Sequence, residues 1–80
     1  MDPGIAFGQV LRALRREAGL SQEQLAFAAD IERNYVSLIE RGANQPSIRI
    51  VFKLAQALGL PASKMITLVE DKLQVQPPEQ

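Results

Sequence analysis

The chain has 80 residues, the size of one small domain, which excludes multidomain enzyme architectures. Hydrophobic residues make up 46% and charged residues 22%, the balance of a chain that folds into a globular domain. Cysteine and histidine are absent, which excludes a disulfide framework, a Cys/His zinc site, a thiol nucleophile and an imidazole base. We therefore expect no metal and no cofactor. Nine basic residues balance nine acidic ones, and this neutrality, taken alone, argues against a DNA-binding protein.

No apolar run approaches the roughly 18 to 20 residues that span a bilayer, and the N-terminal residues lack the basic start and apolar core of a signal peptide. We expect a cytoplasmic protein with no membrane partner. A domain of this size without disulfides or metal buries only about 60% of its unfolded surface. Small chains of this kind often gain stability by association, so a homodimer is also expected.

The first predicted helix opens at Pro3 and Gly4 and ends at Gly19. Its apolar residues recur at spacings of three and four, the stripe of an amphipathic helix, and are Phe7, Val10, Leu11, Leu14 and Ala18. A second, short helix follows Ser21, which forms a capping box with Gln24. These signals predict two helices, and Asp30 with Ile31 makes a tight connection from the second helix to the next.

Two further helices follow in the middle of the chain. Val36 and Ile39 mark the inner face of a third helix. Residues 42–46, which follow it in the sequence, have the composition of a turn. Ser47 caps a fourth helix, which Gly59 ends. The predicted inner face of this fourth helix consists of Ile48, Val51, Leu54, Ala55 and Leu58.

Pro61 suits the first turn of a fifth helix. The apolar face of that helix consists of Met65, Ile66, Val69 and Leu73. The following tail contains two prolines among polar residues, which predicts disorder. No segment shows the alternation of a strand. The sequence thus predicts an all-α fold with one domain over residues 1–73 and a disordered tail over residues 74–80.

The second and third predicted helices are short and are joined by three or four residues, the layout of a helix-turn-helix. Generic helical hairpins share that layout. Ala26 makes the pattern more specific, because a larger side chain at the helix crossing would push the two helices apart. The expected inward residues around it are Leu25, Ala29, Ile31, Val36 and Ile39.

The sequence resembles the Cro/cI-type (xenobiotic-response-element) helix-turn-helix family of repressors over roughly residues 7 to 70. The resemblance rests on LRALRREAGLSQEQLA, YVSLIERG, Pro46 and LAQALGL. It implies a five-helix lambda-repressor-like DNA-binding domain, whose second motif helix enters the major groove while the first crosses the phosphate backbone. Within the family, DIERNYVSLIERG is most similar to the small controller proteins of restriction-modification systems.

The third helix can be phased without the family. With Val36 and Ile39 inward, the outward ridge consists of Arg33, Asn34, Ser37 and Leu38, which also match the family's base-contacting positions. Arginine can bind guanine and asparagine adenine in bidentate geometry. Leu38 departs from the usual polar residue and contacts either a thymine methyl or a partner protein. Glu32 either caps the helix or accepts from a cytosine amino group, and we favour the cap.

Phosphate contacts are expected from side chains that surround this ridge. They are Gln22, which the family places on the DNA backbone, and Tyr35, Arg41, Asn44 and Gln45. For Asn44 and Gln45, an equal alternative is that they are simply polar residues of a turn, without contact to DNA. The resemblance further implies a structural ion pair between Arg15 and Glu40 beneath the motif. Asp30 stands where the family commonly has glycine with positive φ, and aspartate tolerates that region at some strain.

Met65, Ile66, Val69 and Leu73 either complete the core or pair across a two-fold axis. Both hold if Ile66 faces inward while Val69 and Leu73 face outward. We therefore predict a dimer interface at Met65, Val69 and Leu73. Such a dimer would place two recognition helices about one DNA turn, roughly 34 Å, apart.

The sequence predicts a transcriptional regulator that binds the major groove of double-stranded DNA as a homodimer on a palindromic operator. The alternative is an antitoxin or other protein-interaction module of the same fold, favoured by Leu38 and the zero net charge. An enzyme is least supported, because no carboxylate pair has an evident cleft and no phosphate loop appears. Residues 12–53 hold seven basic and five acidic residues. The zero net charge of the whole chain therefore combines a weakly basic segment with an acidic remainder, and it no longer argues against DNA binding.

Overall fold

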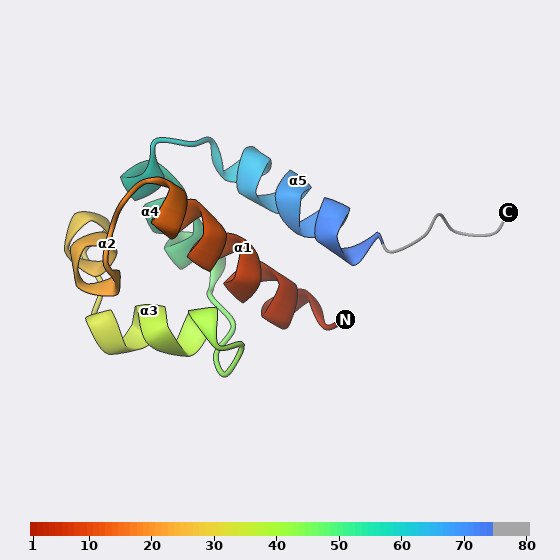
Figure 1. The fold of residues 1–80 in the computed structure, drawn as a ribbon, viewed down its shortest axis with the longest axis horizontal. Helices are drawn as coiled ribbons and strands as arrows, with labels where there is room; N and C mark the ends of the chain where they lie inside the picture. The colour runs from red at the N-terminus through yellow and green to blue at the C-terminus, as the bar shows by residue number, and fades with distance from the viewer. Residues whose placement is uncertain (75–80) are drawn as a thin grey trace, which may run out of the picture.

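The computed structural model describes residues 1–74 and consists of helices joined by short loops (Figure 1). The helices are α1 (Pro3–Glu17), α2 (Gln22–Ala29), α3 (Arg33–Glu40), α4 (Ile48–Leu58) and α5 (Ala62–Leu73). The five-helix, all-α prediction is confirmed. Except for Gln74, the tail predicted to be disordered lies outside the described residues. None of these five helices has the length and apolar character to cross a membrane.

Side-chain caps begin three of the helices. At α2, the backbone amide of Gln24 donates to Ser21 Oγ at 3.0 Å and the amide of Ser21 donates to Gln24 Oε1 at 2.8 Å, so the predicted capping box is present. Ser47 Oγ accepts from the amide of Ile50 at 3.3 Å and caps α4. Asp2 caps α1 by accepting from the amides of Gly4 and Ile5. Each cap satisfies amides that have no partner within the helix.

Helix α1 is the central element of the fold. It lies between α3 and α5 and packs against both, while α2 packs against α3 and α4 (Figure 1). The largest fully buried side chains come from all five helices and are Leu11, Leu25, Val36, Ile39, Leu54 and Met65. One continuous hydrophobic core therefore supports the α2–α3 pair from behind.

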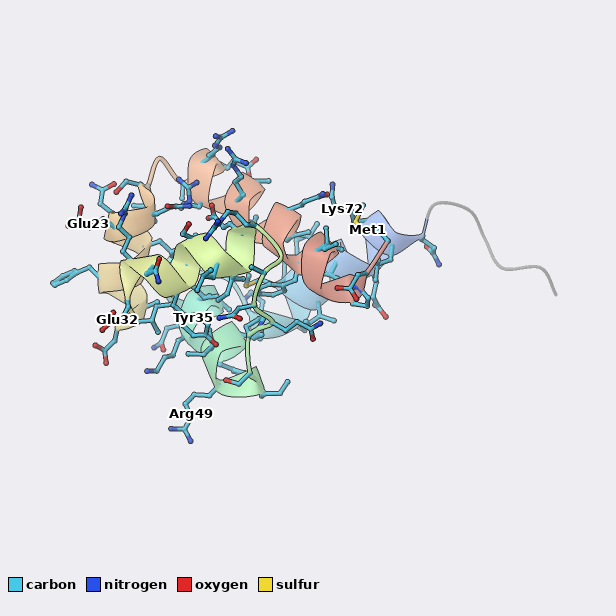
Figure 2. The ribbon with its side chains drawn as sticks, turned by 90° about the horizontal axis from the view of Figure 1, so that it is seen from below. Met1, Glu23, Glu32, Tyr35, Arg49 and Lys72 are labelled. Carbon is cyan, nitrogen blue, oxygen red and sulfur yellow. The ribbon has the colours of Figure 1, made fainter. Side chains whose placement is uncertain are left out.

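Two apolar residues lie outside the faces predicted for them. Ile48 is 73% exposed, because it is the first residue of α4 and this turn projects from the molecule, as Arg49 beside it does in Figure 2. Ile66 is 43% exposed, because Met65 and Val69 set the phase of the inner face of α5. The expectation that Ile66 points inward is wrong.

The same phase corrects the predicted dimer interface. Met65 is fully buried and Val69 is 7% exposed, because α5 turns both side chains into the core. Neither is available to a second copy in this fold, so their assignment to a dimer interface is wrong. Leu73 is half-buried and packs against the same core.

Gly8 allows α1 to approach α3 closely. A β-carbon added at Gly8 would lie 2.3 Å from the carbonyl oxygen of Ile39 and 2.9 Å from that of Glu40. Both neighbours are backbone atoms at the C-terminal end of α3, so no side chain can move aside to make room. Any larger residue at this position would separate α1 from α3.

We expect Gly8→Ala to lower the free energy of unfolding by about 1 to 3 kcal/mol, the range for overpacking a close contact. The loss would occur although alanine is the better helix former by about 1 kcal/mol. Chemical denaturation followed by circular dichroism measures it. Gly4→Ala is the control, because the added β-carbon there would meet side-chain atoms of Gln45 and Asp2. Equal stability of the two variants would contradict the close α1–α3 contact.

Candidate nucleic-acid interface

The two faces of α3 differ in exposure. Val36 and Ile39 are fully buried, which confirms the predicted inner face. On the opposite side Arg33 and Asn34 are exposed, and Figure 2 looks directly onto this outer face of α3. Ser37 and Leu38, by contrast, are half-buried. Arg33 and Asn34 thus form the exposed, N-terminal end of the ridge. Ser37 and Leu38 lie about one turn further along α3, where neighbouring residues partly cover them.

The turn between α2 and α3 depends on Asp30. Its φ of 58° and ψ of 49° lie in the left-handed region, as expected for a residue that replaces glycine. Among residues 1–74 it is the only residue other than glycine with positive φ. The next amide, that of Ile31, donates to the carbonyl of Ala26 at 3.0 Å. This closes α2 and directs the chain into α3.

A buried ion pair lies beneath the motif. Arg15 Nε donates to Glu40 Oε2 at 2.7 Å and Arg15 Nη2 donates to Glu40 Oε1 at 3.0 Å. The two side chains are 10% and 3% exposed. Their parallel hydrogen bonds form the bidentate geometry that a guanidinium and a carboxylate favour. The pair implied by the family resemblance is present and joins α1 to the end of α3.

Two further hydrogen bonds extend this pair. Arg15 Nη1 donates to the carbonyl of Leu20 at 2.8 Å, and Gln22 Nε2 donates to Glu40 Oε1 at 3.0 Å. The network therefore includes the loop before α2 and the first residue of α2. Sequence reasoning missed both bonds. Gln22 and Glu40 are 18 positions apart, and no local pattern relates them.

The charge of Arg15 is stabilised in this position. The hydrogen bonds to Glu40 raise the pKa of Arg15 above its usual value, against the opposing effect of burial. The bonds to Glu40 therefore favour the charged form of Arg15. Since every buried polar side-chain atom in the described part of the chain has a partner, the network lacks no hydrogen bond.

The residues predicted to contact phosphate lie at two ends of the motif. Gln22 begins α2 and is half-buried by its bond to Glu40. Tyr35 is half-buried on α3 (Figure 2), and Arg41 is exposed with its Nε donating to the carbonyl of Ser37 at 3.4 Å. Asn44 and Gln45 are exposed in the following loop. All five side chains are thus exposed or half-buried, and none of them is fully buried.

Glu32 occupies the N-cap position of α3, but its side chain makes no capping hydrogen bond. The expectation that its carboxylate caps the helix is therefore wrong. The exposed carboxylate stands beside Arg33, at the open end of the ridge. Contact with a cytosine amino group stays a prediction. Within residues 1–74, no acidic cluster of the kind that holds a metal ion is present.

Known proteins share this arrangement. Residues 11–65, more than half of the chain, match the family described as "Helix-turn-helix". The chain belongs to the helix-turn-helix family. The matched segment includes α2, the left-handed turn at Asp30, α3 and α4. The Cro/cI-type resemblance is thereby confirmed.

Controller proteins are among the relatives of this helix-turn-helix chain. The control protein C.BamHI of Bacillus amyloliquefaciens is 42% identical over 57 residues, which cover 70% of each chain. The control protein C.MunI of a Mycoplasma species is 37% identical over 70 residues, covering 86% of this chain and 95% of the relative. The crystal structure of the restriction-modification controller protein C.AhdI from Aeromonas hydrophila superposes with a TM-score of 0.75 at 44% identity, covering 76% of this chain and 92% of that chain.

We expect Glu40→Leu to lower the free energy of unfolding by about 3 to 5 kcal/mol, because it leaves the charge of Arg15 buried without a partner. The double variant Arg15→Met, Glu40→Leu removes both charges and should recover most of that loss. Urea denaturation of the two variants and the wild type measures the difference. A double variant as unstable as Glu40→Leu would contradict a stranded charge as the cause.

Proposed function

We propose that this helix-turn-helix protein is a sequence-specific, DNA-binding regulator of transcription. The observation that carries the proposal is the exposure of Arg33 and Asn34 on a helix whose other face is anchored by Val36 and Ile39. A rigidly held helix with free polar residues at its N-terminal end is what insertion into the major groove requires. The controller and transcriptional regulator names of its relatives support the same class.

Direct base readout falls to the outward ridge of α3. Arg33 has the fork geometry that binds guanine O6 and N7, and Asn34 has the amide that binds adenine N6 and N7. Ser37 accepts or donates to either kind of base, and Leu38 packs against a thymine methyl. Because Ser37 and Leu38 are half-buried, most of the discrimination comes from Arg33 and Asn34.

Backbone contacts position this ridge on the duplex. Gln22 binds phosphate at the start of α2 through the second hydrogen of Nε2, since the first is engaged by Glu40. Tyr35 supplies a hydroxyl, Arg41 a charge, and the loop supplies the side chains of Asn44 and Gln45. Few of these groups are cationic, so non-specific affinity is modest.

Stable binding therefore calls for two copies of the chain. We propose a homodimer in which two-fold symmetry places one recognition helix on each half of a palindromic operator, with half-sites about 34 Å apart. The protein works in the cytoplasm by binding alone, without catalysis, and its concentration and dimerisation set the occupancy of the operator.

The relatives suggest a more specific role. Controller proteins occur among both its sequence relatives and the solved structures that resemble it. We place this chain in the same role, as the controller of a restriction-modification system. Deletion of the gene would then change expression of an adjacent endonuclease gene, and complementation by an Arg33→Ala variant would not restore it.

We expect Arg33→Ala to weaken binding to the cognate operator by about 1 to 3 kcal/mol and to relax the preference at one base position. Fluorescence anisotropy with operator variants at fixed salt measures both effects. Lys64→Ala is the matched control, since it removes the same charge from an exposed position on α5. An equal loss on operator and random DNA would contradict a base-reading role for Arg33.

Selection of bound sites from random DNA should yield an inverted repeat with half-sites about one helical turn apart. Sedimentation of the purified complex should give two chains per selected site. A single half-site bound by one chain with full affinity would contradict the homodimer, while leaving the DNA-binding role intact.

A further inference from the structure

Helix α3 begins without the side-chain cap that three other helices have. Asp2, Ser21 and Ser47 precede α1, α2 and α4, and each side chain accepts a hydrogen bond from an early amide of its helix. Glu32 holds the corresponding position before α3 and makes no such bond. Serine or aspartate there would stabilise the helix more, so helix stability does not account for a glutamate at this position.

The backbone of Glu32 is fixed while its side chain is free. Its carbonyl accepts hydrogen bonds from the amides of Tyr35 and Val36 at 3.0 and 3.3 Å, which hold the residue against the first turn of α3. The side chain itself is exposed. Among residues 1–74, no salt bridge joins it to Arg33 or to another cation. The carboxylate therefore projects from a defined point and has its acceptor oxygens available.

The place of Glu32 in the motif brings this carboxylate to the bases. Figure 2, which looks onto the outer face of α3, shows Glu32 at the end where the helix begins. The next residue, Arg33, is exposed at the same end of the outward ridge. A helix that enters the major groove with this end foremost brings both side chains to base edges. Because they start from adjacent backbone positions, the carboxylate and the guanidinium meet neighbouring base pairs.

We propose that Glu32 is a specificity-determining residue of the DNA interface. Its carboxylate accepts a hydrogen bond from the 4-amino group of a cytosine, in the base pair next to the guanine that Arg33 binds. The proposal rests on the DNA-binding function proposed above, and it adds one base pair to those that the outward ridge of α3 reads.

Cytosine is the base whose edge fits a carboxylate. An ionised carboxylate offers acceptors only. In the major groove, cytosine presents a donor alone, adenine presents a donor beside the N7 acceptor, and guanine and thymine present acceptors without a donor. The expected order of preference at this position is therefore cytosine, then adenine, with guanine and thymine last.

The same carboxylate disfavours DNA that lacks a donor at this place. A carboxylate that enters the groove without a partner loses hydration and faces acceptor atoms and phosphates of its own sign. The chain has zero net charge, so no general attraction to DNA offsets this penalty. Glu32 thus contributes to specificity by excluding wrong sequences as well as by binding the right one.

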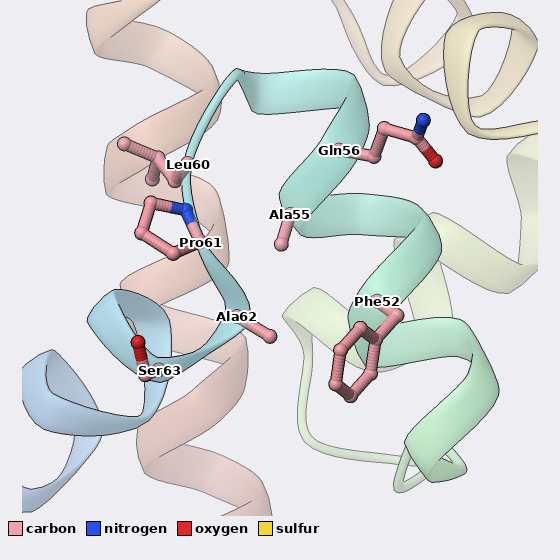
Figure 3. A pocket seen from close by; sticks show the side chains of 7 residues that line it. All are labelled: Phe52, Ala55, Gln56, Leu60, Pro61, Ala62 and Ser63. Atoms are coloured by element: carbon pink, nitrogen blue, oxygen red, sulfur yellow. The ribbon is translucent and has the colours of Figure 1, made fainter.

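The apolar surface of the molecule gives no other role to Glu32. Figure 3 shows Phe52 facing Leu60 and Pro61 across a groove, whose lining residues all belong to α4, α5 and their connection. The exposed ring of Phe27 borders a hollow that is lined only by residues of α2 and its cap. A protein bound at either place would leave the carboxylate available to DNA.

The test compares base preferences of the full chain and its variants, selected in parallel from one duplex library of random sequence at fixed salt. The guanine read by Arg33 is the position at which Arg33→Ala loses its preference. At an adjacent position the wild type should prefer cytosine over guanine by about tenfold, the scale of one good base contact.

Glu32→Gln should change that preference from cytosine to adenine, because glutamine can donate to N7 and accept from the 6-amino group of adenine. Glu23→Gln is the matched control. It removes the same charge from an exposed position on α2 and should leave the preference at every position as in the wild type.

Glu32→Asp separates base reading from capping. The shorter carboxylate can accept from the first amides of α3, as Asp2 does at α1. This variant should therefore melt about 4 to 8 °C higher than the wild type and lose the preference for cytosine. A variant that gains this stability and keeps the full preference would overturn the proposal.

The outcomes separate the role of Glu32 from the DNA-binding function itself. A change from cytosine to adenine at one position, with the others unchanged, supports the proposal. A selected operator that Glu32→Gln leaves unchanged at every position would overturn it, as would tighter binding to all sequences by one common factor, while the DNA-binding function would stand. A wild type that enriches no sequence would overturn both.

Discussion

The buried ion pair between Arg15 and Glu40 holds the DNA-binding motif to the rest of the molecule. Two hydrogen bonds join the guanidinium to the carboxylate, a third binds the carbonyl of Leu20, and Gln22 adds a fourth from α2. A charge pair of this kind resists sliding, because a small displacement breaks several bonds to buried charges. The relative position of α1, α2 and α3 therefore depends on one acidic side chain at the end of α3.

Close packing complements this network. Gly8 lets the backbone of α1 touch the last turn of α3, and Asp30 takes the left-handed conformation that turns the chain between the motif helices. With the inner face of α3 fully buried, contacts within the chain hold the helix in place. A helix held in this way loses less conformational entropy on association than a mobile one.

The charge distribution indicates that the proposed complex depends more on contacts to base edges than on contacts to phosphates. The neutral chain carries a small basic excess within residues 12–53, and Arg15 contributes nothing to it because Glu40 neutralises its charge. Few cations remain to bind the duplex backbone. Affinity in the proposed function consequently depends on Arg33 and Asn34 meeting the right bases and on pairing of two chains.

The sequence by itself determined the helices, the Ser21 and Ser47 caps and the inner face of α3, because capping, turns and apolar periodicity act over a few neighbouring residues. It also located Asp30 at the strained turn and, through the family resemblance, the Arg15–Glu40 pair. The phase of α5 was decided only by tertiary packing, since Met65 and Ile66 are adjacent and equally apolar, and contact with α1 and α4 selects Met65. Exposure of Ile48 and the bond from Gln22 to Glu40 were likewise decided in the folded chain, because both depend on neighbours distant in sequence.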